Sequence, residues 1–240
     1  MYKVISKYYN KIFPLKREKI DFVINLMKTK NDKILDIGCA TGELIIHLSK
    51  LGYYTVGLDI DEEMISYARK RANTLGVEAS FINGDMLRLN EYFQMNKFDV
   101  AICWGNTIAH LNDLNEIKKF ISGCYNILNP EGCLSLQVIN FSKIIKKDSF
   151  SLPEINNDYV IFKRNYYFNS EKKLNFHTEV TIKETGEVFG FDTIHFPILK
   201  DELLGILKDE GFNSFKLYSD FNYKLFEEDD TSVIVNCFKM

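Results

Sequence analysis

Short apolar runs in the first half of this chain end in carboxylates or in a glycine loop. Asp59 ends "TVGLD", Asp85 follows "FING", and "KILDIG" leads into a loop that holds Gly38 and Gly42. Glycine permits a tight turn and a close approach of the backbone to a ligand. Asp59 is placed to accept both hydroxyls of a ribose, and Asp85, with Met86 beside the ring, could accept from an exocyclic amine. Either acid alone could merely cap a turn or a helix. In this order and beside the loop, they predict a nucleoside-like ligand.

The same loop favours a ligand without phosphate. A dinucleotide site of the GxGxxG type has its third glycine at position 43, where bare amides face the pyrophosphate. This chain has Glu43 there, and its carboxylate in the first helical turn would lie near the phosphates. No P-loop Lys-Ser or Lys-Thr pair follows either. An NAD-dependent oxidoreductase and a Walker-type site are therefore disfavoured.

Strand and helix patterns alternate between residues 33 and 141. Continuous apolar runs predict buried parallel strands, and apolar residues at helical spacing predict the helices between them. We expect strands at 33–38, 55–60, 79–85, 97–104 and 132–141, and helices at 17–29, 42–52, 61–76 and 113–128. A further helix at 200–212 and two closing strands at 213–219 and 231–240 complete the pattern.

The pattern changes near residue 150, where three strand-like segments occupy 158–168, 173–183 and 186–196. The predicted fold class is therefore α/β: a doubly wound, mostly parallel, seven-stranded Rossmann-like sheet with an antiparallel three-stranded insertion after the fifth strand. We expect an N-terminal cap segment and helix at 1–30, a ligand-binding core at 31–141 and 198–240, and a substrate-side insertion at 142–197.

Composition narrows the location and the partners. The formal net charge is −3, which implies no strong attraction to nucleic acid or to an anionic membrane. No apolar run reaches the roughly 18 residues of a membrane span, and the N-terminus lacks the apolar region of a signal peptide. We therefore expect a cytoplasmic protein. The five cysteines never form CxxC, so reduced, buried thiols are expected rather than disulfides or a thiolate zinc site.

Residues 31–141 resemble the class I S-adenosylmethionine-dependent methyltransferases. "ILDIGCATG" is similar to the first motif of that family, "VGLDI" to its acidic motif, "INGDM" to its adenine-side motif and "FDVAICW" to its fourth strand. The resemblance implies S-adenosyl-L-methionine as the cofactor. One departure is Ala40, where glycine is commoner. We expect its methyl group to be tolerated if the loop backbone keeps a negative φ.

The resemblance also implies the cofactor contacts. Asp36, Gly38 and Gly42 would line the methionine part, Asp59 would bind the ribose, and Trp104 would lie near the adenosyl group. The complete set of predicted cofactor residues is Tyr9, Asp36, Gly38, Cys39, Ala40, Gly42, Asp59, Ile60, Met64, Asp85, Met86 and Trp104.

The stretch "GNTIAHL" points to a small-molecule acceptor. It is similar to "GNSFAHL" in the glycine and sarcosine N-methyltransferase group, and the [DN]PP[YFW] sequence of base methyltransferases is absent. The resemblance implies that Asn106 and His110 face the acceptor, where His110 could take the proton of an amine. The alternative is that Asn106 caps a turn and His110 packs beneath it. Methylation of a small molecule, on an amine nitrogen, is the predicted activity, with no nucleic-acid partner.

Two further residues are candidates on weaker patterns. "SKYYNKIFP" resembles a segment that folds over the cofactor, so Tyr9, or less readily Tyr8, would hydrogen-bond the methionine end; ordinary packing is the alternative. Arg164 shares a strand face with Phe162 and Tyr166 and could form part of a wall for an anionic acceptor. A solvated strand charge is the alternative for Arg164.

Other functions stay open. An RNA or protein methyltransferase of this fold would need a basic face, for which "KIIKK" at 143–147 is the candidate. A non-catalytic module that binds S-adenosylmethionine is a further alternative. We expect no metal site, because His177 and His195 would need a carboxylate such as Glu179 as a third ligand.

Overall fold

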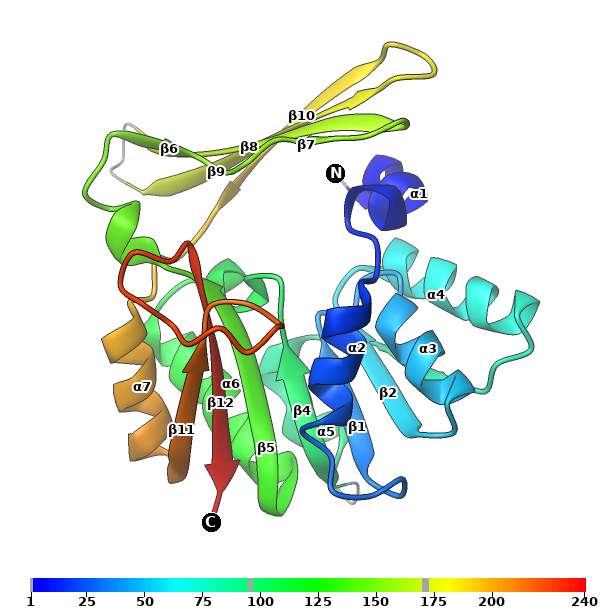
Figure 1. Cartoon of the computed structure of the whole chain (residues 1–240), viewed down its shortest axis with the longest axis vertical. Coiled ribbons are helices and arrows are strands. Elements are labelled where there is room, and N and C mark those ends of the chain that lie inside the picture. Colours follow the sequence, from blue (N-terminus) through cyan, green and yellow to red (C-terminus); the bar gives the residue numbers. More distant parts are fainter. Residues whose placement is uncertain (1, 95–96, 170–172) are drawn as a thin grey trace.

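The computed structural model describes residues 2–94, 97–169 and 173–240, with no account of the side chains of residues 2–5. A seven-stranded sheet with helices on both faces forms the lower body. A smaller antiparallel sheet lies above the ends of its strands (Figure 1). No helix within the described ranges is long and apolar enough to cross a lipid bilayer.

The seven-stranded sheet has the order β11-β12-β5-β4-β1-β2-β3, and β12 runs antiparallel to both of its neighbours. The strand order reverses between β1 and β4, so ligands are expected beyond the carboxyl ends of these two strands. The predicted fold class is confirmed. The strands are β1 (Lys33–Ile37), β2 (Tyr54–Asp59), β3 (Ser80–Asn83), β4 (Phe98–Cys103), β5 (Leu128–Ile139), β11 (Phe212–Tyr218) and β12 (Ser232–Lys239).

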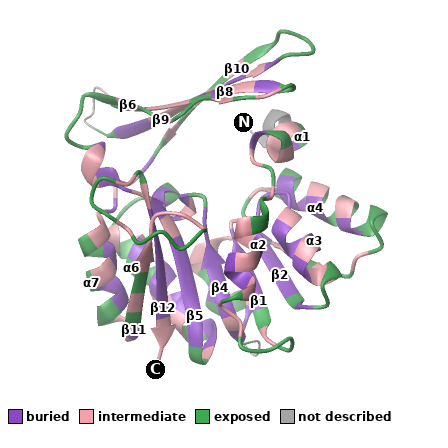
Figure 2. Ribbon diagram, in the orientation of Figure 1, coloured by how far each residue is buried: buried purple, intermediate pink, exposed green. Residues whose placement is uncertain are grey.

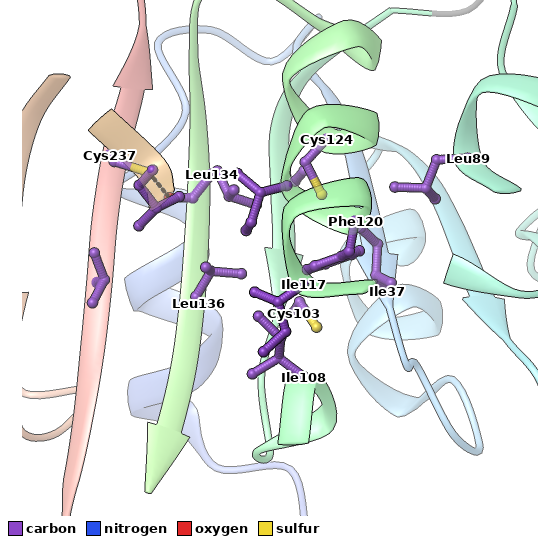
Figure 3. Packing of buried hydrophobic residues seen from close by; sticks show 14 of the residues in the cluster. Ile37, Leu89, Cys103, Ile108, Ile117, Phe120, Cys124, Leu134, Leu136 and Cys237 are labelled. Carbon is purple, nitrogen blue, oxygen red and sulfur yellow. Dashed lines mark hydrogen bonds between the residues drawn. The ribbon is translucent and has the colours of Figure 1, made fainter. Parts of the chain in front are cut away.

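Helices cover both faces of this sheet because both faces are apolar. On one face α2 (Arg17–Ile24) and α3 (Glu43–Lys50) pack on the sheet, and α4 (Glu62–Thr74) packs beside α3. The other face carries α5 (Leu89–Tyr92), α6 (Leu114–Ile127) and α7 (Lys200–Asp209). Figure 3 shows Ile117 and Phe120 of α6 in the same cluster as Cys103 and Leu136 of the sheet. The central strands are accordingly the most buried part of the chain (Figure 2).

The antiparallel sheet above, called the roof sheet here, contains two strands more than predicted. Its three long strands are β8 (Val160–Phe168), β9 (Leu174–Ile182) and β10 (Val188–Ile194), and the short β6 (Ser149–Ser151) and β7 (Ile155–Asn156) both pair with β8. Along β8 the more buried side chains alternate with more exposed ones: Phe162 and Tyr166 are buried, whereas Lys163 and Tyr167 are exposed. This alternation gives the roof sheet one inner face.

The sequence analysis did not predict α1 (Tyr2–Ile12), which lies between the roof sheet and α4 (Figure 1). Asn10 ties this helix to the start of α3, since its side chain donates to Glu43 at 2.6 Å and accepts from Thr41 at 2.5 Å. The Asn157 side chain donates to the Lys11 carbonyl at 2.8 Å, which ties α1 to the roof sheet as well. The N-terminal segment is therefore held by both layers.

The glycine loop, residues 38–42, differs from expectation at Ala40. Its φ is +47°, in the left-handed region, and not negative as predicted. A side chain there costs roughly 1–2 kcal/mol. The Ala40 amide donates to the Asp59 carboxylate at 2.8 Å. Hydrogen bonds to charged groups contribute about 1.5–3 kcal/mol, so this bond is large enough to offset the strain.

Two glycines allow the contribution of packing to be measured separately from that of backbone strain. Gly42 and Gly52 both have positive φ, at +70° and +85°. A Cβ at Gly42 would lie 2.4 Å from the Phe81 ring, whereas a Cβ at Gly52 would meet nothing within 4 Å. We expect Gly52→Ala to destabilise the protein by about 1 kcal/mol and Gly42→Ala by a further 1–3 kcal/mol or so. Urea denaturation measures both, and equal losses would show that Phe81 moves aside freely.

Candidate functional site

A cavity of about 820 Å³ lies at the point where the strand order reverses, beneath the inner face of the roof sheet. Loops after β1, β2, β3 and β4 supply its floor, and β8 and β9 supply its upper wall. A volume of this size is in the range of pockets that enclose a drug-sized ligand. Of the predicted site residues it brings together Tyr9, Gly38, Ala40, Asp59, Ile60, Met64, Asp85, Met86, Asn106, His110 and Arg164.

Four predicted residues are not among those that line the cavity: Asp36, Cys39, Gly42 and Trp104. The Trp104 indole donates to Ser135 at 2.9 Å and packs in the cluster beneath α2. It occupies that face together with Ile102, because side chains two residues apart on a strand point the same way. Cys39 is buried in another cluster, behind the loop. The geometry gives Trp104 and Cys39 no contact with the cavity.

Asp59 holds the floor of the cavity in shape. One carboxylate oxygen accepts from the Ala40 amide and the other from the Asp61 amide at 3.0 Å. Burial raises the pKa of Asp59, and these backbone bonds partly oppose the rise. Each oxygen can accept more than one hydrogen bond, so Asp59 keeps capacity for a ligand's hydroxyl groups. The Asp85 side chain similarly accepts from the Leu87 amide at 2.8 Å while lining the cavity.

Asp36 and Lys19 form a pair of opposite charges near the glycine loop. Burial, together with the charge of Asp59, raises the pKa of Asp36 to about 7, and Lys19 opposes this rise. Burial lowers the pKa of Lys19, which the charge of Asp36 opposes. Lys19 lines the cavity. Lys19 can therefore offer a cation to the carboxylate of a free amino acid, whereas Asp36 is buried and does not line the cavity.

The predicted acceptor residues differ in how free they are. Asn106 is buried, with φ +65°, and both ends of its amide bond to protein: its oxygen accepts from the Ile139 amide at 3.0 Å, and its nitrogen faces Tyr166 at 3.3 Å. His110 is open to the cavity on one side, and desolvation lowers its pKa. The Asn106 side chain does not cap the short helix that follows it. Its hydrogen bonds instead link the loop after β4 to Ile139 and Tyr166.

Arg164 is a cation without a carboxylate partner in the part of the chain that the structure describes. Its guanidinium donates to the Pro153 carbonyl at 2.8 Å, while its Nε is buried and makes no hydrogen bond. It lies near the rings of Phe13 and Phe162, 5.9 and 5.7 Å from their centroids. Burial lowers its pKa. The guanidinium therefore retains donors for an anionic ligand.

Sequence reasoning missed three residues as members of the site: Lys19, Tyr166 and His195. All three line the cavity. The alternation along β8 did place Tyr166 on the same strand face as Arg164, and that shared face was the signal that could have added Tyr166 to the site. Nothing local marks His195, which meets Tyr166 only through the fold: Tyr166 Oη and His195 Nδ1 are 2.9 Å apart.

These groups fit S-adenosyl-L-methionine better than a phosphorylated nucleotide. Asp59 and Asp85 could accept from a ribose and an adenine, and Lys19 could hold the carboxylate of an amino-acid end. Glu43, at the start of α3, pairs with Arg71 and Asn10 where a phosphate would need free amides. A Cβ at Gly38 would meet Thr107 at 2.7 Å, so the close backbone packing in this loop depends on glycine.

Comparisons with known proteins agree. Residues 34–132 match the model of a methyltransferase domain family. The chain is 26% identical to a glycine/sarcosine N-methyltransferase of Halorhodospira halochloris, over 83% of this chain and 72% of that one. It is 25% identical to a carboxy-S-adenosyl-L-methionine synthase of Nautilia profundicola, over 91% and 87%.

A solved S-adenosylmethionine-dependent methyltransferase from Clostridium acetobutylicum shares the fold. It superposes with a TM-score of 0.82, at 18% identity, over 99% of this chain and 98% of that one. The domain match, these relatives and the site together support a class I S-adenosylmethionine-dependent methyltransferase. Its cofactor is S-adenosyl-L-methionine.

The raised pKa of Asp36 predicts a pH dependence of stability in the cofactor-free protein. Between its ordinary value of 3.8 and about 7, the unfolded chain releases the Asp36 proton and the folded chain keeps it. The contribution of Asp36 to the free energy of unfolding therefore falls as pH rises through this window, by up to about 1.4 kcal/mol per pH unit. Asp36→Asn removes this decline.

Urea denaturation at about pH 5 and about pH 7 measures the effect. Glu184→Gln, in the exposed turn between β9 and β10, is the control that removes one carboxylate far from the site. Parallel stability profiles for the wild type and Asp36→Asn would show that the carboxyl group ionises normally in the folded state.

Proposed function

We propose that this protein transfers a methyl group from S-adenosyl-L-methionine to a small-molecule acceptor, on an amine nitrogen. The observation that carries this proposal is the position of the cavity. It extends from the strand ends, where the proposed cofactor residues lie, to the inner face of the roof sheet. Aromatic side chains of that face and of α1's C-terminal flank, such as Phe13, Phe162 and Phe176, enclose a space suited to a small organic molecule. On this proposal residues 142–197 form the acceptor side.

When bound, S-adenosyl-L-methionine supplies a methyl group that its cationic sulfur has already activated. The chain's task is chiefly to hold donor and acceptor in line, and such positioning can be worth roughly 7–11 kcal/mol. We assign the ribose to Asp59, the adenine to Asp85 and Met86, and the carboxylate of the methionine end to Lys19, which lines the cavity. Tyr9, in the last turn of α1, would close over the methionine end of the cofactor.

His110 is suited to receive the proton of an amine acceptor. An amine must be neutral to act as a nucleophile, and a group with a pKa near or below neutrality can accept its proton at pH 7. Desolvation lowers the pKa of His110, which therefore stays neutral at pH 7, and it faces the cavity. Asn106, whose amide is fully used within the protein, would position the loop that carries His110.

Arg164 is the natural partner for an anionic group of the acceptor. It is a cation of the upper wall that has no carboxylate partner among the described residues, and a glycine/sarcosine N-methyltransferase is among the relatives. An amine that also carries a carboxylate would satisfy both Arg164 and His110.

A second candidate follows from the relative named carboxy-S-adenosyl-L-methionine synthase, which the chain matches over 91% of its length. Arg164, which has no carboxylate partner among the described residues, would also suit the carboxylate of a carboxylated cofactor. The product separates the two activities, because a carboxylated cofactor differs in mass from S-adenosylhomocysteine.

The direct test combines binding with turnover. Calorimetric titration with S-adenosyl-L-methionine should show saturable binding, and a panel of small amines and amino acids should release S-adenosylhomocysteine with at least one acceptor. Mass spectrometry of the products then identifies the methylated atom. Binding without turnover on the panel would contradict the proposed reaction, and turnover with RNA or a protein would contradict the acceptor class.

Asp59→Ala should weaken the affinity for S-adenosyl-L-methionine by more than about tenfold, because two hydrogen bonds to a charged group are lost. Calorimetry measures the dissociation constant. The change also removes the acceptor of the Ala40 amide, so a control must separate loss of the ribose contact from distortion of the glycine loop. Ala40→Gly in the same chain removes the strain at φ +47° without restoring any contact to the ribose.

We expect the double variant Asp59→Ala, Ala40→Gly to bind as weakly as Asp59→Ala. Recovery to near the wild-type dissociation constant would show that Asp59 acts only by holding the loop and that the ribose lies elsewhere.

A further inference from the structure

A chain of hydrogen bonds runs from the backbone of β5 to an imidazole in the cavity wall. The Ile139 amide can only donate, and it donates to the Asn106 oxygen at 3.0 Å. The Asn106 nitrogen must therefore face the other way, toward Tyr166 Oη at 3.3 Å and His195 Nδ1 at 3.5 Å. The orientation of this amide is thus fixed by a backbone group.

The orientation of Asn106 in turn fixes the hydrogens on Tyr166 and His195. The Asn106 nitrogen donates to Tyr166 Oη, so this oxygen acts as an acceptor there and its own hydrogen must point elsewhere. The Tyr166 hydroxyl hydrogen is then directed to His195 Nδ1, 2.9 Å away. With Nδ1 as the acceptor, a neutral His195 carries its hydrogen on Nε2.

His195 Nε2 is a buried donor without a partner among the described residues. His195 is only 3% exposed, and its ring stacks on Phe176, with centroids 4.6 Å apart, and meets the His110 ring edge-on at 4.5 Å. Burial, with His110 nearby, lowers its pKa to about 3, so the ring stays neutral at physiological pH. A buried donor without a partner destabilises the folded chain, and a ligand that accepts its hydrogen would recover that loss.

The surroundings of His195 indicate where that ligand lies. His195 lines the main cavity beside Asn106 and His110. It also borders a second hollow of about 470 Å³, which is lined mostly by apolar side chains together with Asn112 and Lys173. We place the ligand of Nε2 in the main cavity because Asn106 and His110, the residues assigned to the acceptor, line that cavity.

We propose that His195 is an acceptor-binding residue that donates its Nε2 hydrogen to an oxygen of the methyl acceptor, and that Tyr166 and Asn106 are positioning residues which lock the tautomer. This proposal rests on the proposed function and extends it. The acceptor carries a hydrogen-bond-accepting oxygen close to the reacting nitrogen, and two neighbouring histidines divide the work: His110 takes the proton, and His195 holds the molecule.

The tautomer can be tested without any acceptor. Protein labelled with ¹⁵N-histidine and saturated with S-adenosylhomocysteine should show a protonated Nε2 and an unprotonated Nδ1 for His195, unchanged between about pH 5 and about pH 8. His195→Gln identifies the signals. Acetate, as a simple oxygen ligand, should shift the Nε2–H signal saturably, whereas methylammonium should not. A hydrogen on Nδ1, a titration within this range, or a signal insensitive to acetate would overturn the proposal.

A matched pair of variants tests the contact in catalysis, with the acceptor found in the turnover panel. In His195→Gln an amide nitrogen reaches the place of Nε2, whereas in His195→Asn the shorter amide reaches only the place of Nδ1. We expect His195→Asn to raise the acceptor KM about tenfold or more, as for loss of a buried hydrogen bond, with the KM for S-adenosyl-L-methionine unchanged. His195→Gln should stay within about threefold of the wild type.

Thermal denaturation of both variants shows whether each is folded. Equal acceptor KM values in the two folded variants would overturn the contact. The tautomer experiment needs no turnover, so failure of the proposed reaction and failure of this assignment are separate outcomes.

Discussion

The site depends on one hydrogen bond, from the Ala40 amide to the Asp59 carboxylate. It links the loop after β1 to the end of β2 and holds an alanine in a left-handed conformation that its side chain disfavours. Asp59 is itself partly buried, and desolvation opposes its charge. The strained loop and the buried carboxylate therefore stabilise each other. Backbone strain held at a binding site in this way is a form of preorganisation.

Two sheets of different topology supply the rest of the site. The lower layer is a parallel sheet, whose carboxyl ends converge at the reversal between β1 and β4 and bring acids from distant segments together. The upper layer is an antiparallel sheet, in which period-two alternation aims Phe162, Arg164 and Tyr166 at the cavity and Lys163 away from it. The first layer supplies groups suited to a cofactor, and the second supplies aromatic rings and unpaired donors.

Features set by residues close together in the sequence could be predicted, and features set by contacts between distant residues could not. The core strands and helices were predictable because apolar runs and turn residues are local signals, and Asp59 and Asp85 could be placed at strand ends for the same reason. The φ of Ala40 could not, because a contact 19 residues away imposes it. Tyr166 and His195 meet across 29 residues and Asn106 and His195 across 89, with no local mark of either contact. Trp104 was assigned to the cofactor from a short resemblance, whereas it shares a strand face with Ile102 and packs under α2.

The attachment of α1 bears on the order of events in folding. Asn157, in the turn between β7 and β8, donates to the carbonyl of Lys11 across a separation of 146 residues. Contacts so distant close a long loop, and their entropy cost is met only after the intervening chain has organised. We expect α1 to dock late, so that the chamber is sealed only once the surrounding architecture is complete.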